Sequence, residues 1–247
     1  MTSEHKDSWE ARAYNKYGSG HATFAQRGNI SKEEIRHQYP AWSKYFGRSL
    51  PAPKNSAILD AGCGNGEFLL WLKESGYSNL EGIDISEEQI ARAKSLGVNA
   101  KHGDLPNFLT AQKNRYDCII ARDIIEHFSK DDLLVLLDGF QNALKPEGVL
   151  IIQTPNAEGP FGSRSRYMDF THHLSFTRLS LGHALSLAGF EKVRFYSMGP
   201  VVHGFFSTIR YAVWKIIELG IRIYQLAETG TGAGIYTQNI IATATKS

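Results

Sequence analysis

The stretch Leu59-Asp60-Ala61-Gly62-Cys63-Gly64-Asn65-Gly66-Glu67-Phe68 decides the fold of this chain. The apolar run 57–59 predicts a buried strand, and the amphipathic run 68–72 predicts a helix. Three glycines within five residues lie between them, where the backbone takes positive φ or approaches a ligand closely. A helix that begins directly after such a turn offers free N–H groups and the positive end of its dipole. We therefore predict a strand, a tight turn and a helix N-terminus that together hold a cofactor.

Strands and helices alternate through the rest of the chain. This order predicts an α/β fold in which a mostly parallel sheet carries helices on both faces. Ligands of such sheets bind beyond the carboxyl ends of the strands, at the point where the strand order reverses. Gly62, Asp84, Asp104 and Arg122 all lie at predicted carboxyl ends. We therefore expect these four residues to meet at one edge of the sheet.

The glycine spacing indicates which cofactor is bound. The dinucleotide fingerprint is G-x-G-x-x-G, whereas this chain has G-x-G-x-G. Asp84 follows the loop by roughly 20 residues, the offset at which an acidic side chain meets a ribose in nucleotide-binding βαβ units. Asp84 as a helix cap and the glycine cluster as a plain turn are the structural alternatives.

Five segments in order resemble class I S-adenosylmethionine (SAM)-dependent methyltransferases. They are the acid-G-x-G-x-G loop, the strand ending at Asp84, the pair Asp104-Leu105, the run 116–128 with its Glu-His pair, and the turn and strand 145–152. The resemblance implies a Rossmann-like, seven-stranded sheet of order 3-2-1-4-5-7-6 with an antiparallel last strand. It also implies SAM as cofactor and S-adenosyl-L-homocysteine as product. The cofactor contacts that it implies are Asp60, Gly62, Cys63, Gly64, Gly66, Asp84, Ile85, Asp104, Leu105 and Arg122. Arg122 departs from the family pattern, which has a small or apolar residue there.

Two regions flank this core. Residues 1–50 are expected to form an N-terminal helical lid, and residues 51–247 the SAM-binding methyltransferase domain. A capping box at Ser31 predicts a helix that Pro40 kinks or divides. Aromatic and histidine side chains in this region either close over the active site or pack on the body: Trp9, Tyr14, Tyr17, His21 and Tyr39.

The domain contains a long connection at 155–177, which we expect to form the wall of the acceptor site. Long connections in compact domains are functional or disordered, and the aromatic residues here argue against disorder. Arg164, Arg166 and Tyr167 are the predicted acceptor contacts, because arginine pairs well with carboxylate or phosphate groups. Solvated loop charges are the alternative interpretation of both arginines.

Methyl transfer to a hydroxyl group needs a base, and histidine is the side chain best tuned for this near neutral pH. His127 is the first candidate because it follows the fourth predicted strand, and His172 and His173 come next. A structural histidine is the alternative in each case. We predict no metal, with a divalent ion on Glu126 and His127 as the alternative, because carboxylate and imidazole ligands suit such ions.

A helical insertion is predicted at 198–236, with its helix over 203–226. One broad face of this helix is apolar and the other carries Arg210, Lys215, Glu218 and Arg222. Charges recur too often for a transmembrane span. We expect the apolar face to pack on the body of the protein first, to form a homodimer second, and to lie on a membrane surface third.

Composition limits the function further. The chain of 247 residues has 42% hydrophobic residues and a net charge of +2, enough for one sizeable core and without a basic stripe for nucleic acid. Its two cysteines, Cys63 and Cys118, are expected to be buried and unpaired. The N-terminus has no apolar signal segment, so we expect a cytoplasmic enzyme.

A finer resemblance links the chain to small methyltransferases of bacterial surface-polysaccharide and O-antigen clusters. It depends on three segments, 169–177, 199–204 and 237–239. It implies O-methylation of a sugar hydroxyl on a glycan or its activated precursor. More distantly, the chain is similar to quinone O-methyltransferases, which implies a phenol acceptor and a divalent metal as the alternative. A SAM-binding protein without catalysis is the alternative from another class.

Overall fold

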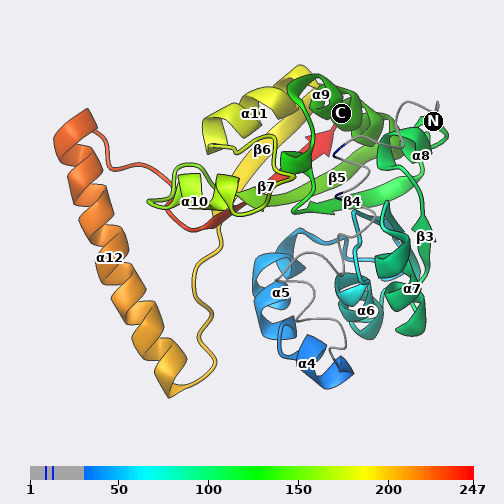
Figure 1. The fold of residues 1–247 in the computed structure, drawn as a ribbon, viewed down its shortest axis with the longest axis horizontal. Helices are drawn as coiled ribbons and strands as arrows, with labels where there is room; N and C mark the ends of the chain where they lie inside the picture. Colours follow the sequence, from blue (N-terminus) through cyan, green and yellow to red (C-terminus); the bar gives the residue numbers. More distant parts are fainter. Residues whose placement is uncertain (1–8, 10–12, 14–30) are drawn as a thin grey trace.

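The fold was analysed in a computed structural model, which describes residues 9, 13 and 31–247. Within these residues the strands form a seven-stranded sheet of order β3-β2-β1-β4-β5-β7-β6 (Figure 1). Neighbouring strands from β3 to β5 run parallel, and β7 runs antiparallel to both β5 and β6. The predicted fold class is therefore confirmed. The strands are β1 Ala57–Ala61, β2 Asn79–Asp84, β3 Ala100–His102, β4 Tyr116–Arg122, β5 Leu144–Pro155, β6 Phe190–Ser197 and β7 Asn239–Lys246.

Helices cover both faces of the sheet. Alternate residues of one strand point to opposite faces, so β1 sends Ile58 to one side and Leu59 to the other. The α-helices are α4 Lys32–Arg36, α5 Tyr39–Tyr45, α6 Glu67–Glu74, α7 Glu87–Ser95, α8 Leu105–Thr110, α9 Lys130–Ala143, α10 Gly162–Tyr167, α11 Arg178–Leu187 and α12 Phe205–Thr229. Two 3₁₀ turns, η2 Gly47–Ser49 and η3 Ile125–His127, complete the described elements.

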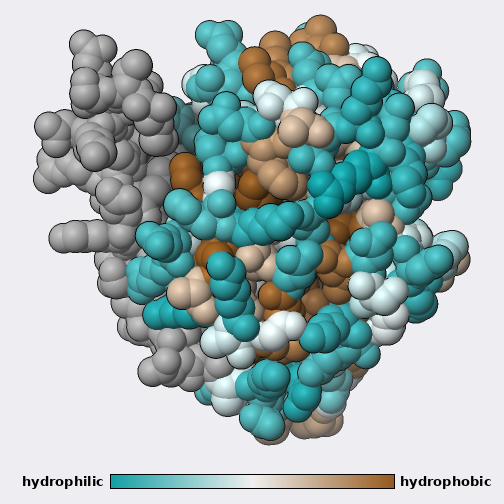
Figure 2. Space-filling model, turned by 90° about the vertical axis from the view of Figure 1, so that its right-hand side faces the viewer, coloured by the Kyte–Doolittle hydropathy of each residue, from teal (hydrophilic) through white to brown (hydrophobic). Residues whose placement is uncertain are grey.

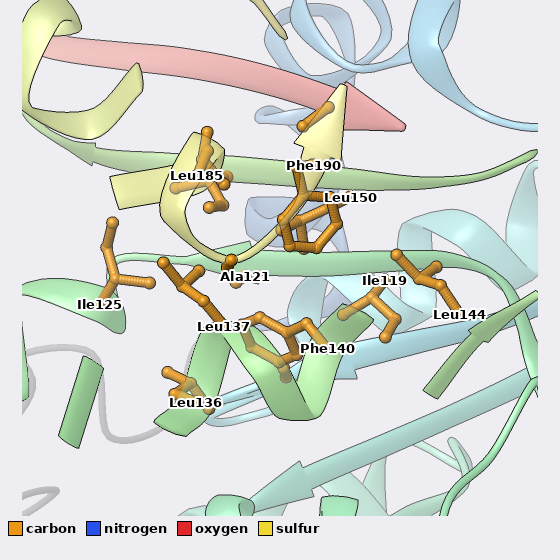
Figure 3. Close-up of a cluster of buried hydrophobic side chains, with 14 of the residues drawn as sticks. Ile119, Ala121, Ile125, Leu136, Leu137, Phe140, Leu144, Leu150, Leu185 and Phe190 are labelled. Atoms are coloured by element: carbon orange, nitrogen blue, oxygen red, sulfur yellow. The ribbon is translucent and has the colours of Figure 1, made fainter. Parts of the chain in front are cut away.

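One hydrophobic cluster lies between the sheet and helices α8, α9 and α11. Side chains of β4 and β5 such as Ile119 and Leu150 meet Leu137 and Phe140 of α9 and Leu185 of α11 (Figure 3). All five side chains are fully buried. Burying an aliphatic or aromatic side chain of this size stabilises the fold by about 1.5–3 kcal/mol. This cluster holds β4 rigidly, and β4 carries the site residues that follow its carboxyl end.

The second cluster lies on the opposite face, under α5, α6 and α7. Trp42 of α5 packs edge-on against Phe68 of α6, with ring centroids 5.3 Å apart. The capping box at Ser31 is present, and the chain forms two short helices with Pro40 in the first turn of α5. Tyr39 donates to Glu74 of α6, so it packs on the body instead of closing over a site. Trp9 and Tyr39 are described, whereas Tyr14, Tyr17 and His21 lie outside the described residues.

Helix capping at the carboxyl edge of the sheet is local. Ser86 accepts from the backbone N–H of Gln89 at the start of α7, and Ser129 accepts from that of Asp132 at the start of α9.

Both Cys63 and Cys118 are buried and unpaired, as predicted.

The position of α12 differs from our first expectation. We expected its apolar face to pack on the body, and this prediction is wrong, because Ser207 is the buried residue of this 25-residue helix. In Figure 1, α12 stands apart from the layers of the sheet. The helix is too interrupted by charge to cross a membrane, and the other described helices do not qualify either.

Candidate active site

The glycine loop between β1 and α6 has the backbone that the sequence predicts. Gly62, Gly64 and Gly66 have φ values of +73°, +51° and +76°, a region that favours glycine. A Cβ on Gly66 would lie 2.7 Å from the Cβ of Ala93, so packing against α7 alone excludes a side chain there. A Cβ on Gly64 would meet no described protein atom closer than 3.4 Å. Close packing therefore explains Gly66, whereas Gly64 leaves space beside the loop for a ligand.

Asp84, at the end of β2, is oriented by the backbone around it. Its Oδ2 accepts from the N–H of Gly64 at 2.8 Å, and its Oδ1 accepts from the N–H of Ser86 at 2.8 Å. Burial raises the pKa of the carboxyl group, and the two backbone donors oppose that rise. Each oxygen accepts one bond here, and a carboxylate oxygen has capacity for two. Asp84 therefore ties the glycine loop to β2 and can still accept hydrogen bonds from a ribose.

Asp60, at the end of β1, is a buried acid with an orphan oxygen. Its side chain is 2% exposed, and Oδ2 has no hydrogen-bond partner among the described residues. Burial, opposed by the charge of Arg122 and aided by that of Asp84, raises the pKa of Asp60 to about 7. A buried acceptor without a donor costs about 1–3 kcal/mol. The position thus suits a cationic ligand group that donates to Oδ2.

Arg122, at the end of β4, lies among aromatic rings. Its guanidinium carbon is 4.4 Å from the ring centroid of Phe68 and 5.3 Å from that of Trp42. Cation–π contact of this kind holds an arginine without neutralising it. The buried Nε has no partner among the described residues, so an anionic ligand group can be received there. Trp42 belongs to α5, so this segment of the expected lid forms part of the surroundings of Arg122.

These two orphan groups test whether the loop fits SAM. The amino-acid end of SAM carries an ammonium and a carboxylate, and its other end carries a ribose. Asp60 and Arg122 match the two charges, Asp84 matches the ribose hydroxyls, and Gly64 leaves the room that a ligand needs. The residues present therefore fit the group.

Four further predicted cofactor contacts have separate surroundings. Ile85 is 39% exposed next to Asp84, as expected of an apolar side chain that packs on a base. Asp104 caps α8 through the N–H of Asn107, which uses one of its oxygens. Leu105 belongs to the core cluster, and Cys63 packs beneath the loop against Gly82. Their contact with the cofactor stays a proposal.

Protonation of Asp60 gives a testable pH dependence. Only the ionised carboxylate meets the SAM ammonium, so SAM affinity should rise about tenfold between about pH 6 and pH 8, as the competent fraction grows. Titration calorimetry in two buffers of different ionisation enthalpy should detect proton release on binding. Asp60→Asn should abolish both effects, and an equal pH dependence in this variant would assign the pH dependence to another group.

The contribution of Asp60 to folding stability changes with pH in the opposite direction to its contribution to SAM affinity. Asp60 favours the folded state below its unfolded pKa of 3.8, and this contribution is lost as the pH rises through about 7.

His127 is held by a chain of side-chain hydrogen bonds. The hydroxyl of Thr171 donates to Oδ1 of Asp169 at 2.7 Å, and its oxygen lies 2.8 Å from Nδ1 of His127. Because the hydroxyl proton is directed at the carboxylate, the hydroxyl oxygen accepts from Nδ1–H. This assignment makes Nε2 the ring nitrogen with the acceptor lone pair. Burial and nearby His172, opposed by Asp169 and by a hydrogen bond to the backbone of Thr171, lower the pKa of His127 to about 4.

His172 and Glu126 complete a cluster with His127. Nδ1 of His172 lies 3.1 Å from the carbonyl oxygen of Ser165, which makes Nδ1 the donor. Its Nε2 lies 4.0 Å from Oε1 of Glu126, a buried oxygen with no hydrogen-bond partner among the described residues. Burial raises the pKa of Glu126 well above its usual value, and Asp123 adds to the rise. Burial thus favours the protonated form of Glu126, which can donate a hydrogen bond within the cluster.

The metal alternative named Glu126 and His127, and the structure places His172 beside them. Ligand atoms of the three side chains lie within 4.8 Å of one another. Methyl transfer from SAM needs no metal, because the methyl group is already activated by its sulfonium. The three side chains therefore offer groups for acid–base chemistry, which needs no metal.

The acceptor loop supplies different contacts from those predicted. Arg166 donates to the carbonyl oxygens of His172 and His173, so it holds the loop together, and its contact with an acceptor stays a proposal. These bonds use two of the five N–H donors of the guanidinium group, one on each terminal nitrogen. Arg164 and Tyr167 are exposed and remain proposed contacts. Trp9 packs on this loop, with its ring 5.4 Å from that of His173 and 5.5 Å from that of Phe170.

Thr171 and Asp169 were missed as functional residues in the sequence. They lie in the motif Asp169-Phe170-Thr171-His172-His173, where an acid two residues before a threonine is also typical of a turn. Asp169 does make that turn, since it accepts from the N–H of Thr171 at 2.9 Å. The spacing signals the turn, and the contact with His127 appears only in three dimensions.

Comparison with known proteins places this site in a family. A family model described as a methyltransferase domain matches residues 32–194, about two thirds of the chain. The chain belongs to this methyltransferase domain family. SAM is the cofactor of the family, which agrees with the fit of Asp60, Asp84 and Arg122. The match also covers α9, β5 and the whole of the acceptor loop.

Individual relatives are more distant. The chain is 30% identical over 120 residues to a putative methyltransferase, YqeM, of Bacillus subtilis, covering 46% of this chain and 47% of that protein. It is 31% identical over 103 residues to a phosphoethanolamine N-methyltransferase of Plasmodium falciparum, covering 40% and 39%. The chain thus spans about half or less of these two curated relatives.

Solved structures support the fold. The crystal structure of a SAM-dependent methyltransferase from Archaeoglobus fulgidus aligns with a TM-score of 0.65 at 22% identity, over 91% of this chain and 98% of that one. A phosphoethanolamine N-methyltransferase of Haemonchus contortus, solved with phosphomonomethylethanolamine and S-adenosylhomocysteine, aligns with a TM-score of 0.58 at 17% identity, over 88% of this chain and 60% of that one.

Proposed function

We propose that this protein transfers the methyl group of SAM to a hydroxyl group of a small polar acceptor, with His127 as general base. The observation that carries the proposal is the hydrogen-bonded chain from Asp169 through Thr171 to His127. A histidine oriented in this way accepts a proton at Nε2 while Nδ1–H stays bonded. The arrangement resembles the logic of a triad, with a threonine hydroxyl between acid and imidazole.

The base lies close to the cofactor loop in the fold. His127 follows Ile124, whose Cδ1 would be 2.9 Å from a Cβ on Gly62. The backbone N–H of His127 donates to the carbonyl of Ile124 at 3.1 Å, so the 3₁₀ turn fixes its distance from the loop. Such fixed geometry supplies much of the acceleration in a two-substrate reaction, because the reacting atoms are already aligned.

Charge balance explains how a buried histidine with a low pKa can act as a base. SAM, when bound, supplies a methyl group on a positively charged sulfur and becomes a neutral thioether as the methyl group leaves. His127 gains a positive charge when it takes the acceptor proton, so the net charge of the buried site does not change. Asp169 favours the protonated ring through the same hydrogen-bonded chain. Proton transfer and methyl transfer therefore favour each other.

For the acceptor we keep the sugar hydroxyl of a bacterial glycan or its activated precursor as first candidate. A hydroxyl group needs the base that His127 offers, and exposed aromatic side chains of the acceptor loop, such as Tyr167 and Phe170, suit the apolar faces of a sugar ring. An amine is the second candidate. The buried carboxyl group of Asp169 would attract an ammonium group, and one curated relative is a phosphoethanolamine N-methyltransferase.

Methyl-labelled SAM with a panel of acceptors tests the proposal. The panel contains nucleotide sugars, glycan extracts, phenols, and amines including phosphoethanolamine, and the carbon-13 shift of the product separates O-methyl from N-methyl groups. We expect transfer to a sugar hydroxyl. An N-methyl product would overturn the hydroxyl assignment and select the amine. Binding of SAM without transfer to any member of the panel would favour a SAM-binding protein without catalysis.

A further inference from the structure

Helix α12 carries a seven-residue repeat along one side. Its seam residues follow one another at alternating intervals of four and three, which is the 3.5-residue period of helices that pair in a left-handed coiled coil. The seam residues are Phe205, Ile209, Ala212, Ile216, Leu219, Ile223 and Leu226. Isoleucine occupies the a positions Ile209, Ile216 and Ile223. Leucine occupies the last two d positions.

This seam faces away from the rest of the chain. Phe205, Ile216 and Leu219 are 75%, 71% and 58% exposed, and the other seam residues are exposed too. The partly buried residues of α12 lie on the other side, where Arg222 donates to the carbonyl oxygens of Gly232 and Gly234 at 2.9 and 3.2 Å. The helix is therefore placed with this mixed side, which also carries Trp214 and Ile221, toward its own body and with the apolar seam toward the outside.

The apolar face of α12 is unusual for this molecule. Seen from the side away from α12, the surface is mainly hydrophilic, with hydrophobic groups scattered among polar ones (Figure 2). The seam, by contrast, is continuous over 22 residues, from 205 to 226, or about 33 Å of helix at about 1.5 Å per residue. A continuous apolar strip of this length on a soluble domain marks an interaction surface.

We propose that α12 pairs in parallel with α12 of a second copy of this chain, seam against seam. Parallel two-stranded coiled coils favour β-branched residues at a and leucine at d, as in α12. The symmetry of such a pair places Ile216 of one copy against Ile216 of the other. Two seams that interdigitate remove both apolar strips from water.

The charges next to the seam decide both the partner and the direction. Lys215 and Arg222 lie at the g positions, and both bind Glu218 of the same helix, at 2.6 and 2.8 Å. In a parallel pair they face Gly220 and Ala227 of the second copy, whereas in an antiparallel pair they would face each other. Both cations are paired with Glu218, which weakens the attraction of this flank for an anionic membrane.

Sedimentation equilibrium of the full chain tests the pairing, with two matched substitutions. Ile216→Gln lies in the seam, and Ile217→Gln alters the neighbouring exposed isoleucine outside it. We expect a dimer for the unaltered chain, a dissociation constant at least tenfold higher for Ile216→Gln, and a change under threefold for Ile217→Gln. Equal weakening by both variants, or a monomer at about 100 μM for the unaltered chain, would overturn the proposal. SAM affinity measured on the same samples should be unchanged, which shows that each variant is folded.

Two further measurements address direction and the competing partner. Ile216→Cys should form a disulfide with itself across the dimer on mild oxidation, because the native cysteines are buried. Ile217→Cys should not. Absence of a cross-link at position 216 would exclude the parallel pair. Vesicles of phosphatidylcholine and phosphatidylglycerol should not bind the chain, and co-sedimentation that Ile216→Gln and Ile217→Gln weaken equally would replace the dimer by a membrane surface.

Discussion

Replacing His127 by alanine should lower kcat by about 10²–10⁴ while the Kd for SAM stays within about twofold, since the base acts on the acceptor proton and not on the cofactor. Turnover is measured at saturating SAM with the acceptor that the panel identifies, and SAM binding by calorimetry. The matched control is His183→Ala, an exposed histidine on α11. Unaltered turnover in His127→Ala would move the assignment to His172 or His173.

The hydrogen-bonded chain behind His127 has its own test. Thr171→Val keeps the shape of the side chain and removes the hydroxyl that links His127 to Asp169. We expect kcat to fall about tenfold, because both tautomers of the ring become populated. Thr171→Ser should restore most of the rate. A full rate in Thr171→Val would remove Thr171 from the positioning of the base.

Asp60 and His127 should take up protons at different pH values, because their pKa values differ. Because the pKa of His127 is lowered to about 4, the ring keeps its proton-accepting form through the mildly acidic range. Asp60, with its pKa raised to about 7, loses its charge in that range. The apparent affinity for SAM should therefore fall on acidification before kcat does. For stability, the neutral His127 contributes above its unfolded pKa of 6.5, and this contribution is lost as the pH falls through about 4.

Replacing Asp84 by alanine should raise the Kd for SAM at least tenfold. Each hydrogen bond to a charged group is worth about 1.5–3 kcal/mol, and Asp84 is placed to accept two from a ribose. The same carboxylate receives the N–H of Gly64 in the glycine loop, so the variant also loosens the cofactor cradle. Calorimetry measures the affinity, and a less favourable binding enthalpy should accompany the removal of the ribose hydrogen bonds.

Two controls separate these contributions. Glu87→Ala removes the same charge three residues away, in the first turn of α7, and should leave the Kd within about twofold. Asp84→Asn keeps the size of the side chain and one accepting oxygen, so its affinity should lie between those of the alanine variant and the unaltered chain. Unchanged affinity in Asp84→Ala would exclude the ribose contact.

Much of the fold could be predicted because the signals are local. Three glycines within five residues demand a tight turn, and all three have positive φ in the structure. The alternation of strands and helices led to the correct strand order through the family resemblance. Helix starts are also local: Ser129 precedes the first turn of α9, and its hydroxyl accepts from the N–H of Asp132.

The candidate site was predicted in part. The sequence could place candidate histidines at the carboxyl edge of the sheet, because the strand ends meet there. It could not predict the hydrogen bonds of Arg166. Its side chain bonds to two carbonyl groups of its own loop, which no spacing rule foresees. The aromatic surroundings of Arg122 likewise depend on Trp42 of α5, which is distant in sequence from β4.

By itself, the sequence determined the class of fold, the cofactor loop with Asp84, and the amphipathic pattern of α12, because each depends on residues within one or two turns or strands. Tertiary structure decided the rest. It joined Asp169 and Thr171 to His127 across more than 40 residues, and it turned the apolar seam of α12 away from the body. The periodicity of a helix determines which residues share a face. The direction of that face is decided by packing elsewhere in the chain. In this protein Arg222, on the side opposite the seam, donates to the carbonyl oxygen of Gly232 in the loop that follows α12.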